Sequence, residues 1–225
     1  MKEVRTIIWD LDETIWFFKE NEVDIICEKL NIIQKEQFKQ EYYNLWENMY
    51  SYFKNKIVTY NEVKQFIEEE MTILKLCHIS LNELLEVIYE RKEELVIVNK
   101  EAIEIMKYFS EKGLKNISIT DCFAQYQKRV LKKLKVLNYI EKIYGCDNAY
   151  IKNSIGKVTQ IIEELELEGR RKEFVMIGDS LSNDIFFAQK LGIKSIWYNR
   201  KGKTNKTSNI PTLEISSLLE LKNIF

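Results

Sequence analysis

The sequence predicts an α/β fold in which a doubly wound parallel sheet carries a long, all-helical insertion. Short apolar runs alternate with amphipathic helical patterns from Val96 onward, which is typical of a parallel sheet covered by helices. Polar residues directly follow these runs, at the edge where such folds bind ligands. Residues 16–95 contain no glycine or proline, and their apolar residues recur at helical spacing. We therefore expect a core of residues 1–15 and 96–225, interrupted by a helical domain of residues 16–95.

The composition fits a soluble globular protein and argues against several classes of function. The chain has 225 residues with 34 basic and 35 acidic side chains, so no basic surplus indicates a nucleic-acid partner. No apolar run approaches the length of a membrane span, and the N-terminus lacks a secretory signal. The four cysteines form no Cys-x-x-Cys pair, which favours free thiols in a reducing cytoplasm over a zinc site. We expect a cytoplasmic monomer or homodimer.

The first strand and the inserted helices follow from local patterns. The run Ile7-Ile8-Trp9 predicts a buried parallel strand. About four helices are expected in the insertion. Thr59 or Asn61 can cap one of them, and Ser80 with Glu83 forms a capping box for another. The apolar face of the longest helix is expected at Phe38, Tyr42, Leu45, Trp46, Met49 and Phe53.

The second part of the core alternates between helix and strand. Asn99 is expected to cap a helix that ends at Gly113. Further strands are predicted at residues 117–121, 143–145, 174–177, 195–198 and 212–215. Further helices are predicted after residue 121 and at residues 157–167, 182–191 and 217–222, with a polar loop at 199–209.

Polar residues gather at four predicted strand ends or in the loops that follow them. These are Asp10/Asp12/Thr14, Thr120/Asp121, the lysine region near Lys157, and Asp179/Asp184. Because the carboxyl ends of parallel strands lie along one edge of a sheet, we expect residues far apart in sequence to meet there.

This group of residues predicts metal-assisted phosphoryl transfer. Asp10, Asp179 and Asp184 can form a hard oxygen site that suits Mg²⁺. A carboxylate can attack phosphorus to give an aspartyl-phosphate, while a second acid, Asp12, protonates the leaving oxygen and later deprotonates water. The cation, one lysine, the Thr120 hydroxyl and the amides after Asp10 would stabilise the charge of the transferred group.

The motifs resemble those of the haloacid dehalogenase (HAD) superfamily of phosphatases and phosphotransferases. Asp10-Leu11-Asp12-Glu13-Thr14 matches the opening motif of that family, and Thr120 matches its second motif. Gly178-Asp179 with Asp184 downstream matches its fourth motif. The resemblance implies an HAD-like, Rossmann-type core whose helical insertion is a cap over small substrates.

The resemblance also implies roles for individual residues. Asp10 would be the nucleophile and Asp12 the acid/base, and the backbone carbonyl of Asp12 would join the carboxylates at the Mg²⁺ site. Thr14 and Thr120 are expected at the phosphate. Asp121 is expected either there or as the cap of the next helix.

The lysine of the third motif has two candidates. Lys152 and Lys157 both precede the strand that leads to Asp179, and the common lysine-proline form is absent. Lys157 begins the amphipathic helix, and its spacing from Asp179 resembles that in phosphoserine phosphatase-type members. We therefore favour Lys157 and keep Lys152 as the alternative.

The function implied is a Mg²⁺-dependent phosphatase for a small phosphorylated metabolite. The alternatives are a phosphotransferase such as a sugar-phosphate mutase, and an HAD-like domain acting on a substrate linked to a carrier protein. Dehalogenation is less favoured, because Asp12 occupies the acid/base position of the phosphatases. Glu13 stands where many relatives have glycine, and its role is left open. Trp16 and Phe17 are expected in packing between core and cap, with lining of the substrate pocket as the alternative. His78 is expected at the surface.

Overall fold

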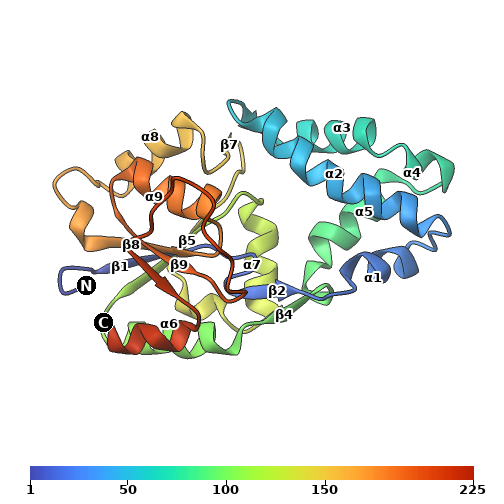
Figure 1. The fold of residues 1–225 in the computed structure, drawn as a ribbon. Helices are drawn as coiled ribbons and strands as arrows, with labels where there is room; N and C mark the ends of the chain where they lie inside the picture. The colour runs from blue at the N-terminus through green and yellow to red at the C-terminus, as the bar shows by residue number, and fades with distance from the viewer.

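The computed structural model describes residues 1–225, apart from the side chain of Glu90. The core strands are β1 (Thr6–Trp9), β5 (Lys115–Ile119), β6 (Lys142–Tyr144), β8 (Phe174–Gly178), β9 (Lys194–Tyr198) and β10 (Leu213–Ile215). They form one parallel sheet in the order β10-β9-β8-β1-β5-β6 (Figure 1). The predicted α/β architecture is therefore confirmed, with β1 at the centre between β5 and β8.

Helices cover both faces of this sheet. The core helices are α6 (Lys100–Glu111), α7 (Ala124–Lys133), α8 (Ile155–Glu164) and α9 (Phe186–Leu191), with short 3₁₀ or π turns η3 (Leu137–Tyr139), η4 (Arg171–Glu173), η5 (Leu181–Ile185) and η6 (Leu218–Asn223). Ile7 and Trp9 of β1 pack with α6, α7 and η6, whereas Ile8 packs with α8 and α9 on the other face. This alternation explains why β1 is continuously apolar.

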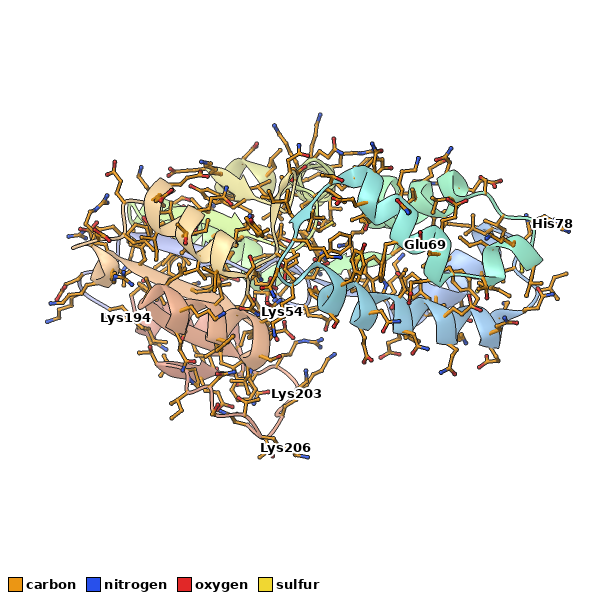
Figure 2. All side chains as sticks on the ribbon, turned by 90° about the horizontal axis from the view of Figure 1, so that it is seen from above. Lys54, Glu69, His78, Lys194, Lys203 and Lys206 are labelled. Atoms are coloured by element: carbon orange, nitrogen blue, oxygen red, sulfur yellow. The ribbon has the colours of Figure 1, made fainter. Side chains whose placement is uncertain are left out.

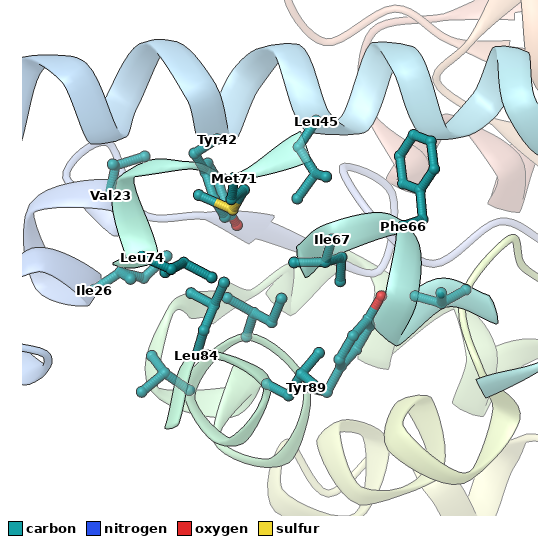
Figure 3. Close-up of a cluster of buried hydrophobic side chains, with 14 of the residues drawn as sticks. Val23, Ile26, Tyr42, Leu45, Phe66, Ile67, Met71, Leu74, Leu84 and Tyr89 are labelled. Carbon is teal, nitrogen blue, oxygen red and sulfur yellow. The ribbon is translucent and has the colours of Figure 1, made fainter. Parts of the chain in front are cut away.

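The insertion forms a separate helical cap beside the sheet (Figure 1). Its elements are α1 (Glu22–Lys29), α2 (Lys35–Phe53), α3 (Tyr60–Glu70), α4 (Ile73–Leu76), α5 (Leu81–Leu85), the π turn η1 (Glu86–Glu90) and the 3₁₀ turn η2 (Lys92–Glu94). Apolar side chains from these helices form one cluster, including Tyr42, Leu45, Ile67 and Leu84 (Figure 3). Thr59 and Ser80 both form the expected capping boxes, with Glu62 and Glu83 respectively. Phe123, Tyr126, Cys146 and Ile151 of the α/β core belong to the same cluster, so the apolar core of the cap continues into the sheet domain.

Two short antiparallel ribbons join the cap to the core. The chain leaves the core through β2 (Trp16–Phe18) and returns through β4 (Val96–Val98), which pairs with it. At the other side, β3 (Ile57–Val58) of the cap pairs with β7 (Ala149–Tyr150) of the core. The sequence analysis missed all four strands, because pairs of two or three residues carry too little periodicity to be recognised.

Two predicted helices differ in form from the expectation. The last one is the 3₁₀ helix η6, which begins at a capping box formed by Ser217 and Glu220. The helix expected from residue 182 opens as the π turn η5, because the N–H groups of Asp184 and Ile185 both bond to the Ser180 carbonyl, at 2.8 and 3.1 Å. Among the described residues, no helix is both long and apolar enough to cross a membrane.

Candidate active site

The first motif lies at the carboxyl end of β1. Asp10 continues the strand by donating its backbone N–H to the Ile177 carbonyl of β8, at 2.9 Å. The chain then turns back, since the Leu11 carbonyl accepts the N–H of Ile15 at 2.8 Å. This turn leaves the side chains of Asp10 and Asp12 on the wall of a cavity between core and cap.

Asp10 is buried and held by two side chains. Lys152 Nζ lies 2.7 Å from its Oδ1, and Thr14 Oγ1 donates to its Oδ2 over 3.3 Å. Thr14 is fully buried, so the structure gives it a contact that orients Asp10, where we had predicted a phosphate contact. Burial and the charge of Asp184 raise the pKa of Asp10 well above its usual value, and the charge of Lys152 opposes them.

The structure corrects the preference for Lys157 as the lysine of the third motif. Lys157 lies in the first turn of α8, where its Nζ donates to the Gly145 carbonyl at 2.6 Å. Lys152 lies in the preceding loop, is 1% exposed, and places its Nζ 2.7 Å from Oδ1 of both Asp10 and Asp184. Spacing along the chain does not separate the two lysines, but the helical turn directs Lys157 back toward the loop after β6.

Three carboxylates converge beside Lys152. One oxygen from each of Asp10, Asp179 and Asp184 lies within 4.8 Å of the others. Burial and the charge of Asp184 raise the pKa of Asp179 to about 7. When all three are ionised, these carboxylates exceed the charge of Lys152 by two, which a divalent cation would balance. Their oxygen atoms are the ligands that Mg²⁺ prefers, so the residues fit this metal.

Gly178 permits the close approach of Asp184. A Cβ atom at Gly178 would lie 2.2 Å from Asp184 Oδ2, so only glycine leaves room for that carboxylate. The same oxygen accepts the N–H of Ser180 at 3.0 Å. The wide π turn after Ser180 thus carries Asp184 back to the sheet edge, which gives the glycine-aspartate motif its physical reason.

Asp12 lies apart from the acidic cluster, against residues of the cap and α7. Its Oδ1 accepts hydrogen bonds from Lys92 Nζ at 2.6 Å and Trp16 Nε1 at 3.0 Å, and its Oδ2 accepts one from Gln127 Nε2 at 2.9 Å. Burial raises the pKa of Asp12, but the Lys92 charge and these three hydrogen bonds outweigh it and lower the pKa below the usual value. Trp16, for which we favoured packing between core and cap, therefore also orients this carboxylate.

Thr120 follows β5 and faces the cavity, as expected. Its Oγ1 accepts the backbone N–H of Cys122 at 3.2 Å and a hydrogen bond from Gln127 Nε2 at 3.1 Å. Because both bonds occupy oxygen lone pairs, the Thr120 hydroxyl hydrogen can donate to a bound anion. Gln127 spans Thr120 and Asp12 and fixes both.

Asp121 neither caps α7 nor offers a donor to phosphate. The residue that precedes α7 is Phe123, which makes no side-chain cap. Asp121 instead accepts the backbone N–H of Lys152 and the Asn183 Nδ2 group, the latter at 2.9 Å. Its carboxylate thereby ties the loop that carries Lys152 to the turn that carries Asp184. The capping contact predicted for Asp121 is therefore wrong, whereas its phosphate contact stays a prediction, since Asp121 also lines the cavity.

Glu13 joins the first motif to the loop after β9. Its backbone φ is 60°, in the left-handed region that favours glycine. Its Oε1 accepts the N–H of Phe18 at 3.1 Å, and its Oε2 lies 3.1 Å from Lys201 Nζ and 3.5 Å from Arg200 Nη2. Glu13 thus adopts a backbone conformation that glycine would adopt more easily, and contacts at both of its carboxylate oxygens hold it there.

A cavity of about 680 Å³ joins these groups to the cap. Its core end contains the acidic cluster, Lys152 and Thr120, and its cap end is lined by aromatic and aliphatic side chains. Tyr50 of α2, which the motifs did not indicate, also lines it. His78 is exposed at the far end of the cap, as expected (Figure 2). The four cysteines are free, as predicted.

Lys92 and Gln127 are two hydrogen-bonding partners of Asp12 that the sequence analysis missed. Each is a polar residue on the inward face of a helical pattern: Lys92 follows the buried Ile88 and Tyr89, and Gln127 precedes Val130. A charged residue at such a position is rarely buried without a partner. A polar residue at a position where the pattern predicts an apolar one was the available signal. That signal predicts a buried partner but does not identify Asp12 as the partner.

A parallel α/β core, an acidic cluster at its edge and a covering helical domain define a Rossmann-type protein with a capped acidic site. A model of the family described as haloacid dehalogenase-like hydrolase matches residues 7–198. The chain belongs to this family.

Individual relatives share the whole fold at low sequence identity. YfnB of Bacillus subtilis (strain 168), which carries the name of a HAD-hydrolase, is 24% identical over 228 residues, covering 100% of this chain and 96% of that protein. Its magnesium-bound crystal structure has a TM-score of 0.70 at 22% identity and covers 99% of this chain and 98% of that one.

Two other solved structures carry different activities in their names. A HAD phosphatase from Thermococcus onnurineus has a TM-score of 0.65 at 23% identity, covering 98% of this chain and 97% of that one. A 2-haloacid dehalogenase from Pseudomonas syringae pv. Tomato DC3000 has a TM-score of 0.66 at 19% identity, with the same coverage. Since phosphatases and dehalogenases share this fold, the choice between them depends on the site.

Proposed function

We propose that this protein is a Mg²⁺-dependent phosphatase that hydrolyses a small phosphorylated metabolite through an aspartyl-phosphate on Asp10. The observation that carries the proposal is the convergence of Asp10, Asp179 and Asp184 around Lys152 at the core end of the cavity. A dehalogenase needs no cluster with two excess negative charges, whereas a phosphatase uses one to hold a cation beside the phosphoryl group.

In the first half of the reaction, Asp10 is the nucleophile. One oxygen of its carboxylate forms a bond to phosphorus while the bond from phosphorus to the ester oxygen breaks. Asp12 in its protonated form gives the proton to the departing ester oxygen. Lys152 and the Thr120 hydroxyl donate hydrogen bonds to the phosphoryl oxygens as negative charge moves onto them. When bound by Asp10, Asp179 and Asp184, Mg²⁺ supplies further positive charge at this position.

In the second half, Asp12 acts as the base. It takes a proton from a water molecule whose oxygen attacks phosphorus, and the bond from phosphorus to Asp10 breaks to release inorganic phosphate. The ion pair with Lys92 favours the carboxylate form that this step requires. Gln127 holds the other carboxylate oxygen, so the group keeps one orientation in both halves.

Hydrolysis of p-nitrophenyl phosphate tests the proposal. We expect Mg²⁺-dependent turnover in the wild type, lost upon chelation, and a fall below about one-thousandth of that rate in Asp10→Asn. Asp24→Asn is the matched control, because Asp24 lies on α1 and pairs with Lys39 outside the cavity. Metal-independent release of halide from 2-haloacids, with no turnover of the ester, would overturn the proposal.

The same assay separates hydrolysis from transfer to a hydroxyl. Hydrolysis releases inorganic phosphate and p-nitrophenol in equal amounts, whereas transfer releases less phosphate than phenol when an alcohol is added. We expect equal amounts. A deficit of phosphate with added sugar or alcohol would indicate a phosphotransferase that uses the same intermediate.

A further inference from the structure

The cap end of the cavity differs in chemistry from the core end. Tyr42, Trp46, Met49 and Phe53 of α2 line it together with Tyr89 from the turn after α5. The rings of Tyr42 and Trp46 meet edge to face, with centroids 5.7 Å apart, and Figure 3 shows Tyr42 and Tyr89 in the cap cluster. Such a surface favours a substrate whose ester group has apolar, ring-sized area to bury.

The positive charges that line this cavity are already paired. Lys152 binds Asp10 and Asp184, and Lys92 binds Asp12 at 2.6 Å. No other lysine or arginine among the described residues lines the cavity. A second anionic group on the substrate would therefore lose its hydration without gaining a counter-ion, which is costly.

Glu22 is the unpaired charge of the cap end. It stands in the first turn of α1, lines the cavity and is half-buried. Its carboxylate accepts a hydrogen bond from its own backbone N–H and, among the described residues, has no partner of opposite charge. Tyr43 lines the same cavity as Glu22, and burial first, and then the charge of Glu22, raise the pKa of its hydroxyl. A negative charge beside tyrosine and tryptophan rings is a favourable environment for an organic cation.

We propose that the ester group of the substrate is an apolar, ring-sized body carrying an ammonium group that pairs with Glu22. This proposal rests on the phosphatase function proposed above. The phosphate occupies the core end beside Lys152, the apolar body lies against Tyr42 and Trp46, and the ammonium group meets Glu22. The cavity of about 680 Å³ is within the range of small-molecule sites.

A charge series on one aryl scaffold tests this proposal. Tyramine phosphate, phenyl phosphate and 3-(4-phosphonooxyphenyl)propanoate share the phenyl phosphate unit and carry a positive, a neutral and a negative substituent. We expect kcat/KM to fall in that order in the wild type. The step from phenyl phosphate to tyramine phosphate should be about fivefold, as expected for a partly exposed ion pair.

Variants of Glu22 assign the preference to its carboxylate. In Glu22→Gln the ratio of kcat/KM for tyramine phosphate to phenyl phosphate should fall about fivefold, and in Glu22→Lys the propanoate should become the preferred ester. Glu28→Gln is the matched control, since Glu28 is exposed on the same helix outside the cavity and should keep the wild-type ratio.

Two results overturn the proposal while leaving the phosphatase function in place. One is equal kcat/KM for the three esters in the wild type, and the other is a wild-type ratio retained in folded Glu22→Gln. Failure of the wild type to hydrolyse p-nitrophenyl phosphate with Mg²⁺ would instead overturn the phosphatase function on which the proposal rests. Thermal melting of each variant establishes that it is folded.

Discussion

Replacing Lys152 by methionine removes the positive charge at the centre of the acidic cluster. The side chain is 1% exposed, and its Nζ lies 2.7 Å from both Asp10 Oδ1 and Asp184 Oδ1. Methionine fills much of the same volume but leaves two buried carboxylates without their partner. Breaking a buried pair in this way costs about 3–5 kcal/mol of unfolding free energy. For a chain of this size, that lowers Tm by about 6–20 °C.

The metal provides a second and sharper readout. In Lys152→Met the three carboxylates remain as metal ligands and the competing charge of Lys152 is gone, so Mg²⁺ should raise Tm by more in the variant than in the wild type. Activity should nevertheless stay low, with kcat/KM about 10²–10³-fold below the wild type, because the phosphoryl oxygens lose a preorganised donor. Thermal melting with and without Mg²⁺ and the p-nitrophenyl phosphate assay measure both effects.

Lys157→Met is the matched control for this experiment. Lys157 is also buried, but its Nζ bonds to the Gly145 carbonyl, so its loss should cost stability without removing activity at saturating Mg²⁺. The reasoning is refuted if Lys157→Met is inactive while Lys152→Met retains turnover. It is also refuted if Mg²⁺ stabilises Lys152→Met no more than the wild type.

Three further predictions follow from the surroundings of single carboxylates. In Lys92→Met the pKa of Asp12 should rise, because Lys92 holds it down, so the acid limb of the pH–rate profile should move to higher pH; an unmoved limb would contradict this. Asp179, with a pKa of about 7, holds a proton in the folded, metal-free protein that the unfolded chain releases, so stability without metal should fall as the pH rises toward 7. Apparent Mg²⁺ affinity, measured by calorimetry, should rise up to about tenfold per pH unit over the same interval, and Asp179→Asn should weaken that dependence, with Asp10, whose pKa is also raised, contributing the remainder. Glu13→Gly should be more stable than Glu13→Ala by about 1 kcal/mol in urea unfolding, since both lose the anchors but only glycine relieves a φ of 60°; equal stabilities would argue against strain.

The core could be predicted because its signals are local and strong. Ile7 and Trp9 point to one face of β1 and Ile8 to the other, and all three are apolar. A run of this kind predicts a strand that lies between two layers of helices. Asp10 and Asp179 follow such strands immediately, so the topology of a parallel sheet brings them together without further information. Their meeting within 4.8 Å is a consequence of strand order alone.

The choice between Lys152 and Lys157 as the lysine of the third motif could not be made from the pattern of strands. Lys152 and Lys157 lie five residues apart at the start of the same helical segment, and either could reach the sheet edge from sequence spacing. Three contacts decide between them: the backbone N–H of Lys152 bonds to Asp121, Ser154 caps α8, and Lys157 turns inward to Gly145. Helix starts shift by one or two residues without any change in hydrophobic period, so periodicity cannot fix such contacts.

The cap contributes side chains and backbone contacts to the candidate site. Lys92 at the end of the cap forms an ion pair with Asp12 of the core. On the other side, β3 of the cap pairs with β7, which ends two residues before Lys152. Both lysines of the cavity are therefore placed by segments that contact the cap. Because these contacts join residues 80 and about 90 positions apart in sequence, only the packed structure reveals them. A cap displaced from the core would separate Lys92 from Asp12, so the protonation of Asp12 and the closure of the cap are physically coupled.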